Sequence, residues 1–274
     1  MSRFCRGIFM RNRASKFASS VAVAFLAFAG TAAWAETRLS LATGVDYSVG
    51  EYGGTEETEV IAVPFAVRLT MDDWTFRLSA SYLDVTGPAD ISEDGDSESL
   101  GAVVRDGSDS GWGDTTFSVE RSFRRIGGTS AYTEVSARVR FPTGDETKGL
   151  GVGATDYGIS TEVGVSTSDG GAYISAGYRF LGERDEGPER QDGMQAGIGA
   201  WLPVGNRLRV GAFGNWREAS IEDGEDPANA GAYVSYRASE RLRVTLTASG
   251  GLSDASPDQM VGIRFNWLPG ALND

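Results

Sequence analysis

The chain has 274 residues, of which 41% are hydrophobic, and its 25 basic and 38 acidic residues give a formal net charge of −13. This acidic balance argues against binding to nucleic acid, because such proteins need clustered positive charge. The chain has no histidine, which argues against hydrolases with a histidine base and against the usual zinc chemistry.

Residues 1–35 have the features of a cleaved export signal. A basic leader precedes the apolar run Val21–Gly30, and Ala33-Trp34-Ala35 supplies small residues at the cleavage positions. The apolar run is shorter than the roughly 20 residues that a membrane-spanning helix needs, so a retained anchor is the less favoured alternative. Cleavage would leave residues 36–274 as a single barrel domain without cysteine, because Cys5 is the only cysteine of the chain.

Twelve later segments alternate between apolar and polar residues, and this period of two predicts β-strands. They span residues 37–49, 59–70, 74–85, 113–123, 131–141, 156–167, 172–181, 194–202, 207–217, 231–238, 241–251 and 259–268. The connections after odd-numbered segments are mostly long, glycine-rich and acidic, whereas those after even-numbered segments are short. An even number of strands with loops sorted by length is typical of a bacterial outer-membrane barrel.

Four short motifs occur in the middle of the chain: Phe141-Pro-Thr-Gly-Asp145, Gly149-Leu-Gly151, Thr155-Asp-Tyr157 and Gly177-Tyr-Arg-Phe180. They resemble the outer-membrane family named for the meta-pathway of phenol degradation, and Gly111-Trp-Gly-Asp-Thr115 is similar to a further motif of that family. The resemblance implies an outer-membrane transporter barrel. The family offers no defined catalytic or binding residues to transfer to this chain.

The last segment resembles the terminal strand signal that the barrel assembly machinery reads. Gly262 precedes Phe265 and Trp267 on one face, although Met260 stands where that signal has a polar residue. We therefore expect the assembly machinery as a partner during biogenesis. Outer-membrane lipid and lipopolysaccharide are the expected surroundings of the folded chain.

Arginines predominate on the face that the alternation turns away from lipid. The candidate lumen-lining residues are Arg38, Arg68, Arg77, Arg138, Arg140, Arg179, Arg217 and Arg264. The same face carries Arg207, Arg209, Arg237, Arg241 and Arg243, most of them near the short-turn end, and the carboxylates Asp46, Glu120, Glu134, Asp156 and Glu162. Two interpretations remain open: the arginines pair with these carboxylates and fill a narrow barrel, or they attract anionic or phenolic solutes.

Two acidic runs, Glu93–Glu98 and Glu222–Asp226, carry the carboxylate oxygens that calcium and magnesium prefer. Neither run has the ligand spacing of a known calcium loop, so solvated surface loops are the favoured interpretation. We expect no metal site, no cofactor and no catalytic residue.

The sequence thus predicts an all-β protein, a transmembrane antiparallel up-and-down β-barrel of about 12 strands in the outer membrane of a Gram-negative bacterium. We expect a passive channel for small solutes, aromatic or anionic ones among them, with the loop from Thr86 to Trp112 folding inward as a constriction. The alternative is a structural or adhesive barrel with a plugged lumen and acidic surface loops. A membrane enzyme would need a catalytic group other than histidine and is the least favoured class.

Overall fold

The computed structural model describes residues 37–51, 57–87, 107–184, 189–222 and 224–271. The expected export signal and the acidic run Glu93–Glu98 lie outside these residues.

The described part of the chain forms thirteen strands and two short 3-10 helices. The strands are β1 (Thr37–Gly50), β2 (Thr58–Met71), β3 (Trp74–Thr86), β4 (Ser108–Trp112), β5 (Thr115–Arg124), β6 (Ala131–Phe141), β7 (Asp156–Ser166), β8 (Gly171–Phe180), β9 (Gly193–Val204), β10 (Leu208–Arg217), β11 (Ala228–Arg237), β12 (Leu242–Gly251) and β13 (Gln259–Ala271); the helices are η1 (Ile126–Gly128) and η2 (Glu146–Lys148). None of the helices in the described ranges has the length and apolar character to cross a membrane.

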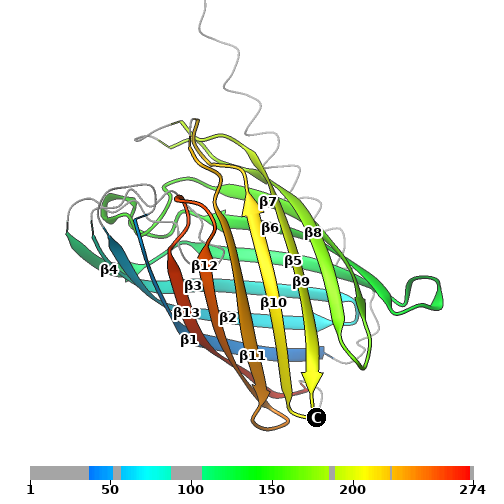
Figure 1. Ribbon diagram of the computed structural model, residues 1–274. Coiled ribbons are helices and arrows are strands. Elements are labelled where there is room, and N and C mark those ends of the chain that lie inside the picture. Colours follow the sequence, from blue (N-terminus) through cyan, green and yellow to red (C-terminus); the bar gives the residue numbers. More distant parts are fainter. Residues whose placement is uncertain (1–36, 52–56, 88–106, 185–188, 223, 272–274) are drawn as a thin grey trace, which may run out of the picture. The chain divides into compact units, whose positions relative to one another are not determined.

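The strands close into one antiparallel ring (Figure 1). Each strand from β5 to β13 pairs with the next along the chain, and β1 pairs with both β2 and β13. Both β4 and β5 pair with β3, so together they occupy one position of the ring. The result is the closed twelve-stranded barrel that the alternation predicted.

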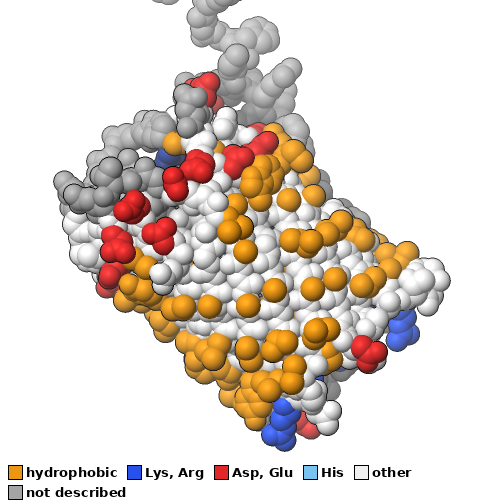
Figure 2. Space-filling model, viewed as in Figure 1, with side chains coloured by type: hydrophobic (Ala, Val, Ile, Leu, Met, Phe, Trp, Pro, Cys, Tyr) orange, Lys and Arg blue, Asp and Glu red, His pale blue; other side chains and the backbone are white. Residues whose placement is uncertain are grey.

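Side chains that point outward from the ring are mostly hydrophobic and exposed. Examples are Val45, Phe65, Leu78, Val135, Ile159, Ile174, Ile198, Val234, Leu246 and Phe265. Figure 2 shows hydrophobic side chains spread over the wall, whereas acidic side chains gather near the end that carries the long loops. A wall of this kind suits lipid, because the closed ring pairs its backbone groups and leaves no sheet edge in hydrocarbon.

The fourth expected strand begins earlier than the sequence indicated. We expected it at residue 113, but Ser108–Trp112 forms β4 and pairs with the end of β3, from Thr86↔Ser108 to Tyr82↔Trp112. Aspartate and glycine are poor strand formers, and here the pairing with β3 overrides that propensity. The last residues of the expected constriction loop therefore stand in the barrel wall, while residues 88–106 lie outside the described residues.

An ion pair crosses the seam between β1 and β13, where the ring closes. Arg264 Nη2 donates a hydrogen bond to Asp46 Oδ2 at 2.6 Å. Gly262, the residue opposite Asp46, leaves room for this carboxylate, because a β-carbon at position 262 would overlap it. The pair thus joins the first and last strands on the inner face.

Replacing Asp46 by Asn should destabilise the barrel, because Arg264 would keep its charge in a half-buried site without a carboxylate partner. The expected loss is about 1–3 kcal/mol in the free energy of unfolding. Urea unfolding of the protein in lipid vesicles, followed by tryptophan fluorescence, measures it. The exposed carboxylate of Asp84 supplies the control, Asp84→Asn; equal unfolding midpoints for the two variants would contradict the stabilising role of the seam pair.

Candidate functional site

Among the described residues, three cavities inside the ring share one lining residue, Arg138. The largest, with a volume of ≈ 560 Å³, is lined by residues of β1, β2, β3, β6 and β10 to β13. A second, of ≈ 160 Å³, lies mainly among β5 to β11, and a third, of ≈ 200 Å³, among β2, β3, β5, β6, β7 and β9. We call them, in the order given, the large, upper and side cavities. The volume of the large cavity falls within the range usual for small-molecule sites.

Arginines outnumber carboxylates among the described residues that line these cavities. The arginines are Arg68, Arg77, Arg138, Arg140, Arg179, Arg217 and Arg264, and the carboxylates are Asp46, Glu120 and Asp156. Arg38, the eighth candidate, lines none of the three; it is exposed near the start of β1, at the short-turn end. The cavities are therefore positively charged, although the chain as a whole is acidic.

Arg68 and Arg77 stand directly opposite each other in the pairing of β2 with β3. Both line the large and side cavities. Their register continues to Ser118 on β5 and then to Arg138 on β6. Three arginines thus follow one line of strand pairing across the inner wall.

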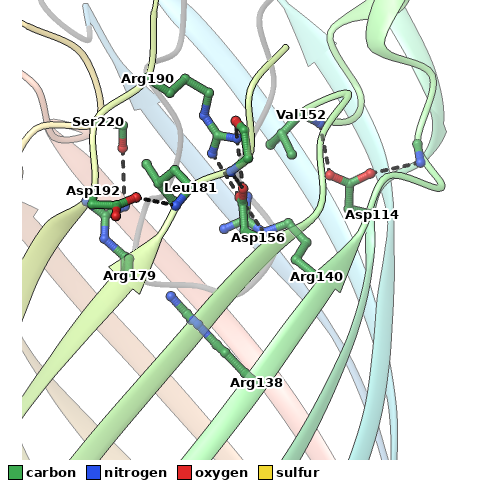
Figure 3. Close-up of polar contacts among 12 residues, drawn as sticks. Asp114, Arg138, Arg140, Val152, Asp156, Arg179, Leu181, Arg190, Asp192 and Ser220 are labelled. Carbon is green, nitrogen blue, oxygen red and sulfur yellow. Dashed lines mark hydrogen bonds and ion pairs between the residues drawn. The ribbon is translucent and has the colours of Figure 1, made fainter. Parts of the chain in front are cut away.

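The side chain of Arg138 extends from β6 across the neighbouring strand (Figure 3). Its pairing partner is Gly158, and a β-carbon there would lie 2.9 Å from Arg138 Nε. The guanidinium Nη2 donates to Gln195 Oε1 on β9 at 3.4 Å. The absence of a side chain at position 158 therefore allows Arg138 to lie along the wall and reach the next strands.

Asp156 is the centre of a polar network at the loop end of the barrel (Figure 3). Its two oxygens accept hydrogen bonds of 2.8 Å from Arg190, and Gly182 N donates to Oδ1 at 2.9 Å. Arg140 Nε lies 3.9 Å from the same carboxylate. The network ties the β8–β9 loop to β6 and β7, so Arg140 fits the packing interpretation. Sequence reasoning missed Arg190, because it lies outside the alternating segments.

Arg179 also has a structural role. Its side chain is buried, with 1% of the residue exposed, and it donates to Ser220 Oγ at 3.2 Å and to the carbonyl oxygen of Glu218 at 2.6 Å. These contacts join β8 to the β10–β11 connection. Arg217, close by at the end of β10, is buried as well.

The β6–β7 connection, residues 142–155, folds over the barrel interior; we call it the strap. Its Leu150 is 2% exposed and packs in a cluster with four inward-facing residues near the loop ends of β2 and β3. These are Val60, Ala62, Leu83 and Val85. A described loop thus does fold inward, and it is the strap; most of the loop after Thr86, for which we expected this role, lies outside the described residues. The signal in the sequence was an apolar Leu150 within a glycine-rich loop.

Asp114, between β4 and β5, holds the strap. Its Oδ1 accepts a hydrogen bond from Gly144 N and its Oδ2 one from Val152 N, each at 2.9 Å. Within the strap, Asp145 accepts a hydrogen bond of 2.6 Å from the Thr147 hydroxyl, which holds the pKa of Asp145 below its usual value. Two carboxylates, Asp114 and Asp145, thus organise this loop.

A further arginine group lies toward the short-turn end. Arg209 stacks on Trp201, with its guanidinium carbon 3.9 Å from the ring centroid. Arg237 and Arg243 stand directly opposite each other in the pairing of β11 with β12. Arg207 and Arg241 lie in the adjoining turns.

In the acidic connection between β10 and β11, a carboxylate makes a hydrogen bond within the connection itself: Asp226 Oδ1 accepts from Ala219 N at 2.9 Å. Across the described ranges, no three His, Cys, Asp or Glu residues gather in a way that would hold a metal ion.

Removing the carboxylate of Asp114 should loosen the strap. In Asp114→Ala, the amides of Gly144 and Val152 lose their acceptors, and we expect hydrogen exchange at these amides to speed up about tenfold or more. Exchange measured by mass spectrometry tests this. Asp192→Ala is the control, because Asp192 accepts from Leu181 N on another loop and should leave the strap protected. Unchanged exchange in Asp114→Ala would show that Leu150 packing alone holds the strap.

Comparisons with known proteins agree with the architecture. A crystal structure of an outer membrane channel from Pseudomonas putida F1 is 12% identical, with a TM-score of 0.63, over 87% of this chain and 97% of that chain. The NanC porin is 9% identical, with a TM-score of 0.52, over 82% of this chain and 97% of the porin. No curated protein matches the sequence. At these identities the structural likenesses establish the fold, which is that of a Gram-negative outer-membrane barrel.

The family model described as "Putative MetA-pathway of phenol degradation" matches residues 37–268, nearly the whole barrel. The match confirms the resemblance that the motifs indicated. The chain belongs to this family.

Proposed function

We propose that the protein is a narrow passive channel for small solutes with a preference for anions. The observation that carries this proposal is the lining of the three cavities, where the described residues include seven arginines and three carboxylates. A lumen with low-dielectric walls and one predominant sign of charge concentrates ions of the opposite sign. The solved structures that share this fold include an outer membrane channel and a porin, which also supports a channel.

Transport would occur by diffusion past weak, repeated electrostatic sites. Arg138 borders all three cavities, so an anion that moves between them passes its guanidinium. Binding must be favourable enough for entry and weak enough for release. Several arginines that share an anion meet both conditions better than one tight site.

The two interpretations of the inner arginines apply to different residues. Arg140, Arg179 and Arg264 hold loops or strands, as their contacts with Asp156, Ser220 and Asp46 indicate. The proposal therefore assigns selectivity chiefly to Arg68, Arg77 and Arg138, which follow one line of strand pairing across the inner wall. In the side cavity, that line faces a single described carboxylate, Glu120.

The strap favours a second candidate function. Its buried Leu150 closes part of the interior near the loop end, as a structural or adhesive barrel with a plugged lumen would require. In that case the acidic loops would make surface contacts and the arginines would serve packing.

The proposal includes several expectations that accompany an outer-membrane channel. Residues 1–35 would be removed after export, the barrel assembly machinery would read β13, and lipopolysaccharide would surround the loop end. The protein would have no catalytic activity.

Single-channel conductance of the refolded protein in a planar bilayer under a salt gradient tests the proposal. We expect discrete conductance steps and a reversal potential that indicates anion preference. Replacing both Arg68 and Arg77 by Gln should move the reversal potential toward zero, because the lining loses two positive charges.

The matched control is Arg121→Gln. Arg121 lies over the rings of Trp74 and Phe123, at 5.1 and 5.0 Å, outside the three cavities, so selectivity should stay unchanged. A folded barrel without conductance would favour the plugged, structural function, and a cation preference would contradict the proposed role of the arginines.

A further inference from the structure

Two arginines of like charge stand directly opposite each other on the wall of the large cavity. The register pairs Arg68 of β2 with Arg77 of β3, and both line this cavity. Like charges in directly opposed positions of neighbouring strands destabilise a sheet. Natural proteins keep locally unfavourable arrangements chiefly at functional sites. Since this pair also lines the large cavity, unlike the opposed Arg237 and Arg243, it is a candidate binding element.

The large cavity has positive charge in excess. Among its described lining residues, Asp46 is the one carboxylate, and it already accepts a hydrogen bond from Arg264. Arg138 lines the same cavity and adds a further positive charge. An anion that enters would therefore meet a wall whose own carboxylate is already engaged.

The opposite wall offers an apolar contact. Phe213 of β10 lines the large cavity, and β10 stands six positions from β3 in the ring of twelve. Beside it, Asn215 and Asn229 contribute neutral amides. The cavity thus has a cationic side on β2 and β3 and an aromatic side chain across from it.

We propose that the large cavity binds a small organic carboxylate with an apolar body. The carboxylate contacts the guanidinium groups of Arg68 and Arg77, and the apolar body packs toward Phe213. This inference rests on the proposed function, because it names the class of solute that the channel holds during passage.

The chemistry of the two sides favours this class of ligand. A guanidinium group presents a planar fork of N–H donors that fits a carboxylate with two parallel hydrogen bonds. A bound carboxylate also offsets the repulsion between Arg68 and Arg77. An inorganic anion would satisfy the arginines but gain nothing from Phe213, whereas an apolar body removes that ring from water.

Isothermal titration calorimetry of the refolded protein in lipid nanodiscs, with benzoate as the probe, tests the proposal. Acetate, inorganic phosphate and benzyl alcohol are the comparison ligands. We expect benzoate to bind more tightly than acetate or phosphate, and benzyl alcohol, which has no carboxylate, to give no measurable binding.

Variants identify the residues that bind. Arg68→Gln and Arg77→Gln should each weaken benzoate binding about tenfold, since each removes a charge-assisted hydrogen bond. Phe213→Ala should weaken the binding of benzoate but not that of acetate. Arg243→Gln is the matched control: Arg243 belongs to an opposed arginine pair with Arg237 but lines none of the three cavities, so benzoate affinity should not change.

A folded variant migrates differently on SDS gels with and without boiling, and this test is applied to every variant. If either Arg68→Gln or Arg77→Gln does not fold, the benzoate affinity of the other variant tests the proposal. Unchanged benzoate affinity in the folded glutamine variants would overturn the proposal. An equal loss of benzoate affinity in Arg243→Gln would also overturn it, as would phosphate binding as tight as that of benzoate.

The same preparations separate this inference from the proposed function. Protein that conducts ions but does not bind benzoate refutes the carboxylate site and leaves the channel intact. Protein that binds benzoate through Arg68 and Arg77 but does not conduct supports the site and refutes the channel.

Discussion

The antiparallel pairing of β1 with β13 is the contact on which the rest of the barrel depends. Hydrocarbon supplies no partners for backbone N–H and C=O groups, so an open sheet edge within it would cost several kcal/mol for each unpaired group. The pairing runs from Arg38↔Ala271 to Val49↔Gln259 and leaves neither strand as an edge. Once the ring is closed, each strand has one face toward lipid and one toward the interior.

This division of faces explains where the charged side chains lie. The outer face takes hydrophobic side chains, so the arginines of the strands fall mostly on the inner face, where they meet few carboxylates. Some of them are used to hold loops, as Arg179 shows with its bonds to the β10–β11 connection. Others, such as Arg68 and Arg77, face each other across one strand pairing and line the cavities. Under the proposed function, some arginines therefore serve packing and others select the solute.

The strands could be predicted from the sequence because period-two alternation is a local signal and the ring enforces it. Alternation is weak in Ser108–Trp112, where serine, aspartate and glycine replace apolar residues, so the sequence does not predict β4. The sequence also predicts that β11 begins at residue 231, whereas the strand begins at Ala228. The contacts of the site are non-local. Asp114 with the strap, Arg190 with Asp156 and Arg138 with Gln195 each join segments more than 25 residues apart, and no short sequence pattern encodes them.

Chemical accessibility of the interior tests the central claim, an inner face that is open to solutes and positively charged. In a background with Cys5→Ser, a single cysteine replaces Thr247, which lines the large cavity, and another replaces the exposed Thr161 of β7. Anionic and cationic thiosulfonate reagents are applied to the protein in lipid vesicles. The account predicts that the cysteine at position 247 reacts, about tenfold faster with the anionic reagent, and that the one at position 161 reacts with neither. Equal rates, a faster cationic reagent or an unreactive position 247 would contradict it.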